Sequence, residues 1–368
     1  MPPHKSHHFV PQFYLRNFGE ENSIAMFNIA RRQHIPTASI PGQCQRSYLY
    51  GRDPSVEAAL AQMEGLASIA IRNLIVTETV PADDSVAFFS LVAFLAFQHG
   101  RTPQAGAVMN EIATKLSRAI LKMPGMVPAE LHADIPKLRA SWGKAALQSL
   151  GIAASVSHVL LDLRPFLLIN DTPQPFITSD SPVVFFNPWC RGWRGSGVTA
   201  FASSGLQIFL PLSPRHLLML VDDDVYAFAD ASGVIHVDRY RDVKGLNALQ
   251  LLGVEHNLYY RRTPTAQEAI DDLPLHWMHD SIAAVHVQRA VAADERSQLV
   301  GLHQEQPDVR LDLSFFRVRR AKRAVPLPVR ARSHRQRALD ADRFFRGRSR
   351  KDLPADIASR LFHVVEVD

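Results

Sequence analysis

The first half of the chain is dominated by long apolar segments that begin with helix-capping residues. Asp53-Pro54 and Thr102-Pro103 each place a capping side chain directly before a proline, which is typical of the start of a helix. Between these two pairs, the almost uninterrupted apolar run Val86–Phe97 predicts a buried helix. One or two further helices are expected before residue 164. The pattern therefore predicts a helical part over about 50–163.

Beyond residue 164 the pattern changes to short β-branched and aromatic runs that are broken by Pro, Gly and Asp, as is typical of strands. The expected elements are strands at 166–169, 176–178, 183–186, 206–210, 216–221 and 257–261, helices at 243–253 and 265–290, and an earlier hairpin of 23–29 with 33–37. Helices first and strands later predict an α+β fold. We expect an N-terminal helical half, then a mixed, mainly antiparallel sheet with a few helices over about 164–316.

The charge of the chain is distributed very unevenly. The 368 residues carry a net charge of +5, but residues 317–351 hold 14 of the 41 Lys and Arg and only 2 of the 36 Asp and Glu. This segment therefore carries +12 and the remaining residues carry −7. Runs of like charge are usually solvated. The distribution predicts a single body over 1–316 followed by a basic, partly disordered C-terminal extension over 317–368.

Cysteine usage and the N-terminal sequence predict a cytoplasmic protein. Two distant cysteines, Cys44 and Cys190, exclude a disulfide framework. The N-terminus lacks the apolar run of a signal peptide, and the twelve residues of 86–97 are too few to cross a bilayer, so we do not expect an integral membrane protein. No glycine-rich dinucleotide or phosphate-binding motif is present, so no nucleotide cofactor is indicated.

A first cluster of candidate residues precedes the apolar element 9–18. His7 and His8 stand before it in a His-His-apolar-apolar-Pro string that resembles the start of the ββα-metal nucleases, in which one His activates water beside a metal ion. Asn28 and His34 would be the later members. However, too few residues precede the histidines to form the strand that this motif requires. The alternative is an N-terminal arm that its aromatic residues hold against the core, with exposed histidines.

Two further clusters lie at the ends of predicted elements. Gln98 and Arg101 close the apolar helix, where Arg either stabilises the helix C-terminus or presents a guanidinium for phosphate or carboxylate. Asp180 follows a predicted strand, where its carboxylate either caps backbone amides or serves as a metal ligand or general base. The string Ser213–His216 predicts a hairpin corner.

The basic extension suggests its own partners. Arg343 and Arg346 flank Phe344 and Phe345, a combination that suits phosphate contacts together with base stacking, and so predicts nucleic-acid binding through residues 317–351. The same composition suits an anionic membrane surface. An acidic protein partner, including the acidic body of the chain itself, is a third possibility.

Three strings of the chain resemble a known family. The segments His8–Phe18, Gln98–Pro103 and Phe176–Pro182 are similar to those of a large, mainly bacterial family defined as a domain of unknown function (number 4238). Members more often have Tyr at the position of Phe9 and Asn at that of Ser181. The resemblance implies an α+β body and a bacterial source, and it implies no activity. The basic extension lies outside the similar region.

Two classes of function remain open on the sequence. The first is a metal-dependent phosphodiester hydrolase, nuclease-like and of the bacterial conflict or defence type. In it, His7 or His8 is the general base, His8 and Asp180 hold Mg²⁺ or Mn²⁺, Arg101 stabilises the developing charge, and Gln98 contacts substrate. The second is a non-catalytic protein that binds nucleic acid or protein, such as a toxin partner, an immunity factor or an adaptor.

Overall fold

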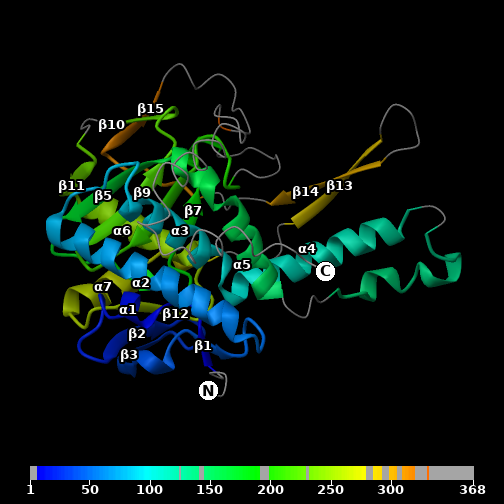
Figure 1. The fold of residues 1–368 in the computed structure, drawn as a ribbon, viewed down its shortest axis with the longest axis horizontal. Coiled ribbons are helices and arrows are strands. Elements are labelled where there is room, and N and C mark those ends of the chain that lie inside the picture. Colours follow the sequence, from blue (N-terminus) through cyan, green and yellow to red (C-terminus); the bar gives the residue numbers. More distant parts are fainter. Residues whose placement is uncertain are drawn as a thin grey trace.

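The structure is a computed structural model that describes residues 6–123, 126–140, 145–190, 199–228, 232–278, 285–291, 298–304, 309–319 and 330. Within these residues the chain folds as an α+β protein, as the sequence predicts (Figure 1). The helices are α1 (Gln12–Leu15), α2 (Pro54–Thr77), α3 (Val86–Gly100), α4 (Pro103–Leu121), α5 (Ala145–Val156), α6 (Tyr240–Ala248) and α7 (Pro264–Asp271).

The strands form two larger sheets and three two-stranded pairs among the described residues. The strands are β1 (Ser6–His8), β2 (Ser23–Asn28), β3 (Gln33–Ser39), β4 (Gln45–Ser47), β5 (Arg164–Asn170), β6 (Thr178–Ser179), β7 (Val184–Phe186), β8 (Gln207–Pro211), β9 (His216–Val221), β10 (Tyr226–Phe228), β11 (Val234–Val237), β12 (Asn257–Tyr260), β13 (Val285–Val291), β14 (Gln298–Gln304) and β15 (Phe316–Val318).

Side-chain caps explain where the helices begin. The Asp53 side chain accepts a hydrogen bond from the backbone N–H of Ser55, and the Thr102 hydroxyl accepts one from that of Ala105. Each bond satisfies a backbone donor that the first turn of a helix leaves free. The predicted starts of α2 and α4 are therefore confirmed. The apolar run between them forms α3, whose side chains are mostly buried.

The five-stranded central sheet, in the order β11-β5-β9-β8-β7, is buried on both faces. Leu167 and Ile169 of β5 share one apolar cluster with α2 and α3, whereas Phe166 and Leu168 share the opposite cluster with α6. Strands covered on both faces show continuous apolar runs instead of alternation. This explains the uninterrupted apolar runs of residues 165–169 in β5 and 217–221 in β9.

The second sheet joins distant parts of the chain in the order β3-β2-β12-β6. Its central strand β12 pairs Tyr259 with Met26 of β2 on one side and with Thr178 of β6 on the other. The predicted hairpin is confirmed as β2 and β3. Because β6 ends one residue before Asp180, this sheet brings that residue near the N-terminal arm.

The predicted helix over 265–290 is wrong in its second half. Helix α7 ends at Asp271, and Pro274 follows shortly after it. A proline disfavours helical backbone at the residue before it and cannot continue a helix. Residues 285–291 instead form β13, which pairs with β14, and Figure 1 shows this hairpin beside α4.

The last described segments still belong to the folded body. Val309 and Leu313 are buried in the same apolar cluster as α6, and β15 pairs with β10. Strand β15 thus crosses residue 316, where the sequence places the end of the body. Of the extension over 317–368, the structure describes only the end of β15, Arg319 and Arg330.

Two helical stretches among the described residues, α2 and 145–162, have the length and hydropathy that a membrane crossing requires, and 33% of the 18-residue apolar window in each is buried. Core helices of soluble proteins have the same length and hydropathy.

We expect Gly100→Ala to destabilise the protein, because α3 and α5 touch at this residue. A Cβ on Gly100 would lie 2.5 Å from Cβ of Ala153 and 3.0 Å from the carbonyl oxygen of Ser149. Forcing such contacts in a packed interior costs about 1–3 kcal/mol. The matched control is Gly151→Ala on α5, where nothing lies within 4 Å of the new Cβ. It should be neutral or stabilising by roughly 0.5–1 kcal/mol. Urea unfolding of both variants measures the difference, and equal stabilities would contradict the packing.

Candidate functional site

The two histidines of the N-terminal arm lie on β1 and point to opposite sides of it. His7 is buried, with its ring stacked on that of Tyr50 at 5.6 Å between centroids. Its Nδ1 accepts the backbone N–H of Tyr50 at 3.2 Å, and its Nε2 lies 3.4 Å from Glu57. His8 is half-buried, and its Nε2 lies 3.1 Å from the carbonyl oxygen of Pro41. His7 is therefore part of the packing, and His8 keeps partial access to solvent.

Arg101 is fully buried and binds the N-terminal arm. Its Nε donates to the carbonyl oxygen of Phe9 at 2.9 Å and to Oε1 of Gln98 at 2.9 Å. The Gln98 amide donates to the same Phe9 oxygen at 2.8 Å. A terminal nitrogen of Arg101 donates to Glu64 of α2 at 2.6 Å. The amide and the guanidinium at the end of α3 thus join the arm to two helices.

Asp180 caps the turn before β12. Its carboxylate accepts the backbone N–H groups of Glu255 at 2.8 Å, His256 at 2.7 Å and Asn257 at 3.0 Å. Burial raises the pKa of Asp180 to about 6, whereas these three donors act in the opposite direction because they favour the ionised form. Of the two roles that the sequence leaves open, the contacts seen here are those of a cap.

A buried polar network lies next to these residues, and the sequence reasoning missed it. The Cys44 thiol donates to the Tyr259 hydroxyl at 3.4 Å. The Tyr14 hydroxyl donates to the carbonyl oxygen of Pro211 at 2.6 Å and lies 2.7 Å from the Thr178 hydroxyl. Burial raises the pKa of Cys44, Tyr14 and Tyr259 far above their usual ranges, so all three are neutral at pH 7. A buried neutral thiol is chemically inert.

His8, Arg101 and Asp180 lie in one neighbourhood, but the hydrogen bonds described above do not join any of the three to another. Phe9, which binds Arg101 through its oxygen, donates its backbone N–H to the carbonyl oxygen of Cys44 at 2.8 Å, and the charges of Arg101 and Asp180 both act on the Cys44 thiol. The hydrogen bonds of His8, Arg101 and Asp180 described above each go to other groups. Within the described ranges, no three His, Cys, Asp or Glu side chains are placed to hold a metal ion. Arg343, Phe344, Phe345 and Arg346 lie outside those ranges.

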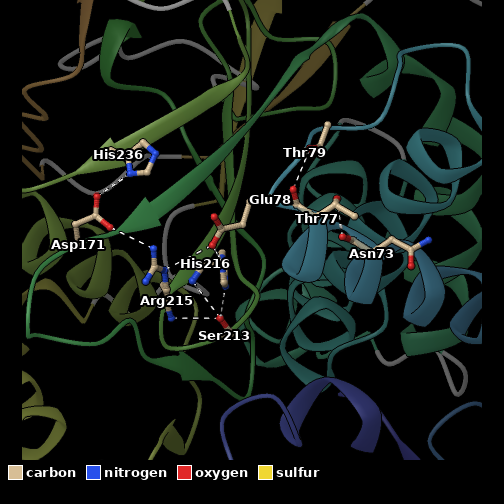
Figure 2. Close-up of polar contacts among 9 residues, drawn as sticks. All are labelled: Asn73, Thr77, Glu78, Thr79, Asp171, Ser213, Arg215, His216 and His236. Carbon is tan, nitrogen blue, oxygen red and sulfur yellow. Dashed lines mark hydrogen bonds and ion pairs between the residues drawn. The ribbon is translucent and has the colours of Figure 1, made fainter.

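A second polar group, which we name the strand-end cluster, consists of Glu78, Asp171, Arg215, His216 and His236 (Figure 2). Glu78 follows the last turn of α2 in a left-handed conformation (φ +48°), and Asp171 follows β5. Asp171 accepts from His236 at 2.7 Å and from Arg215 at 3.4 Å. The contact with His216 and the charges of Arg215 and His236 lower the pKa of Glu78. The cluster joins the end of α2 to the central sheet.

Together with Ser213, two members of the strand-end cluster form a serine–histidine–glutamate chain. Oγ of Ser213 lies 2.9 Å from Nδ1 of His216, and Nε2 of His216 lies 2.9 Å from Oε1 of Glu78. This order matches the relay of nucleophilic hydrolases. However, the backbone N–H groups of Arg215 and His216 both donate to Oγ of Ser213, at 3.2 and 3.1 Å. A hydroxyl has two lone pairs, so neither remains free for attack. The hydroxyl is the cap of the predicted corner.

With the fold and the clusters defined, comparison with known proteins identifies the class. Most of the α+β body, residues 6–264, matches the model of a protein family. The chain belongs to that family, the proteins of unknown function DUF4238. This confirms the resemblance that the sequence strings indicate. Neither the curated proteins nor the solved structures contain a significant match.

Asp180→Ala should lower the free energy of unfolding by about 3 kcal/mol or more, because it leaves three backbone donors without an acceptor. Asp83→Ala removes an exposed carboxylate and is the matched control, with an expected change below about 0.5 kcal/mol. Urea unfolding is measured for both variants with Mg²⁺, with Mn²⁺ and with EDTA. A wild-type stability that depends on the divalent ion, lost in Asp180→Ala, would show a metal ligand instead of a cap.

We expect Ser213 not to react with a fluorophosphonate probe, because its hydroxyl lone pairs are occupied by backbone donors. Intact-mass spectrometry after prolonged incubation measures the labelled fraction, with a known serine hydrolase as positive control. Labelling of Ser213 that disappears in His216→Ala would show that the relay is catalytic.

Proposed function

We propose that the protein is a non-catalytic binding protein whose basic C-terminal segment contacts nucleic acid. The body then acts as the scaffold that presents this segment. Roles of this kind include an adaptor, an immunity factor or the partner of a toxin in bacterial conflict.

The observation that carries the proposal is the use of the Asp180 carboxylate. A hydrolase of the predicted type needs this group free to hold Mg²⁺ or Mn²⁺ together with His8. Its two oxygens instead accept three backbone N–H groups. Arg101 and Gln98, the predicted contacts for the scissile phosphate, are likewise bound to the Phe9 carbonyl oxygen.

Charge distribution supports nucleic acid as the partner. Residues 317–351 carry +12 and the rest of the chain carries −7. A net acidic body repels a polyanion, so attraction must originate in this segment. Arg317, which begins it, is exposed on β15. Arginine next to Phe344 and Phe345 also suits stacking of single-stranded bases.

Full-length protein should bind single-stranded DNA or RNA with an affinity that falls steeply with salt, because phosphate binding releases counterions. Replacing Arg343 and Arg346 by Gln should reduce the slope of log K against log salt by about 1–2. The control replaces two exposed arginines of the body, Arg31 and Arg72, by Gln and should leave the slope unchanged. Fluorescence anisotropy with labelled oligonucleotides, at several salt concentrations, measures both.

The same samples test the competing proposal, a metal-dependent phosphodiester hydrolase. We expect no cleavage of the oligonucleotides with Mg²⁺ or Mn²⁺. Cleavage that His8→Ala abolishes would establish the hydrolase and remove our proposal. If both double variants lose the same affinity for the oligonucleotides, the attraction of nucleic acid is not confined to the basic segment. If the protein binds only an acidic protein, that protein replaces nucleic acid as the partner.

A further inference from the structure

Arg330, from the basic segment, is inserted into the folded body. Its side chain is only 4% exposed, as is that of Asp162, to which it is paired. Asp162 ends the 3₁₀ turn η4 (Ser157–Asp162), which precedes β5 in the chain. An arginine of a strongly basic segment is normally solvated. This one is therefore held by a specific arrangement of acceptors.

Each of the three guanidinium nitrogens donates to an acceptor of the body. Nε and one terminal nitrogen lie 3.0 Å from the two carboxylate oxygens of Asp162. The two hydrogens of that terminal nitrogen go to the carbonyl oxygens of Val159 at 2.7 Å and Phe201 at 2.6 Å, so its contact with Asp162 is an ion pair. The other terminal nitrogen donates to the carbonyl oxygen of Ser203 at 3.0 Å. We name the Asp162 carboxylate and the carbonyl groups of Val159, Phe201 and Ser203 together the Asp162 socket.

The geometry of the Asp162 socket selects a guanidinium. The fork of Arg can pair with both carboxylate oxygens and still reach carbonyls on two other sides. A Lys ammonium carries its three donors on one nitrogen and cannot reach all these acceptors. The backbone takes part as well, since the N–H of Arg330 donates to the carbonyl oxygen of Ala202 at 2.9 Å. The body thus holds both the side chain and the backbone N–H of Arg330.

Arg330 differs from the other buried arginine in what surrounds it. Arg101 follows α3 and lies beside the apolar core, so it is released only when the body unfolds. The hydrogen bonds of Arg330 go to η4 and to the turn at 201–203. Contacts of this kind open locally, at a lower free energy than global unfolding.

We infer that the Asp162 socket is a binding site for an arginine side chain, filled in cis by Arg330, which reversibly anchors the basic C-terminal segment to the body. When Arg330 leaves the socket, the buried Asp162 carboxylate loses its ion pair with this guanidinium. The state in which Arg330 is bound is therefore favoured over the state in which it is released. The anchor makes the position of the segment an equilibrium between two states. The inference does not depend on nucleic-acid binding and would stand if the partner were another molecule.

The wild-type chain tests the anchor directly by arginine modification with phenylglyoxal, with site-resolved rates from mass spectrometry at low conversion. Exposed Arg310 should react fastest, and Arg101 should react only through global unfolding. The modification rate of Arg330 should lie between these two rates and differ from each by about 10-fold or more, because Arg330 is exposed by a local opening of its contacts. A rate equal to that of Arg310 would overturn the docking, and a rate equal to that of Arg101 would overturn its reversibility. Protection that increases with protein concentration would overturn the assignment in cis.

A second experiment tests the selectivity of the Asp162 socket. Full-length Arg330→Ala, shown to be folded by circular dichroism, is titrated with a labelled peptide of residues 326–334. The peptide should bind this variant at least ~10-fold more tightly than it binds wild type, whose socket is filled at a high effective concentration. Replacing Arg330 of the peptide by Lys should weaken binding at least ~10-fold. The matched control replaces its Arg332 by Lys and should bind like the parent.

Two results of the peptide titration would overturn the inference. One is equal binding of the parent peptide and its Arg330→Lys version to the folded variant. The other is no detectable binding of the parent peptide to that variant. If the full-length Arg330→Ala variant does not fold, the modification rates of the wild-type chain still decide between the anchored and the free state.

Discussion

The buried guanidinium of Arg101 is the contact on which the arrangement of the N-terminal half depends. A fully buried arginine is tolerable only when its charge is paired, because an unpaired buried charge costs several kcal/mol. Glu64 pairs this charge, although the second terminal nitrogen of Arg101 has no hydrogen-bond acceptor among the described residues. The partners of the guanidinium are the Phe9 carbonyl oxygen, Gln98 and Glu64. Helix α3 can therefore occupy its place only when the N-terminal arm and α2 are also in place. The arm in turn hydrogen-bonds to Cys44, beside the second sheet.

The features that could be predicted from the sequence are those that local physics decides. Asp53 and Thr102 cap helices through donors two or three residues away, so a short window contains the complete interaction. The continuous apolar runs of β5 and β9 likewise report burial on both faces. The end of α7 differs from the prediction because Pro274 interrupts a helical pattern that the sequence continues beyond it. The pairing of β5 with the parallel strand β11 depends on contacts that no local pattern contains.

The roles of the candidate site residues could not be decided in the same way. For Asp180 the sequence offers a cap or a metal ligand, and the choice depends on three donors more than seventy residues away. For Arg101 it offers a helix C-terminus or a substrate anion, and the main partner is a carbonyl oxygen 92 residues earlier. Ser213 and His216 were correctly predicted as a corner, but Glu78, which completes the chain of hydrogen bonds, is 138 residues from His216. The type of a polar residue determines which groups it can hydrogen-bond to, but the fold determines which of those groups is its partner.

The region that this chain shares with its family is shorter than the unit that folds. The family match ends at residue 264, yet Val309 and Leu313 complete the apolar cluster on the α6 face of the central sheet. Ser314 donates its backbone N–H to the buried carboxylate of Asp242 on α6. A chain cut at the end of the family region would expose an apolar face and leave that carboxylate without these donors. In this chain, the segment around residues 309–314 is therefore part of the folding unit although it lies outside the family region.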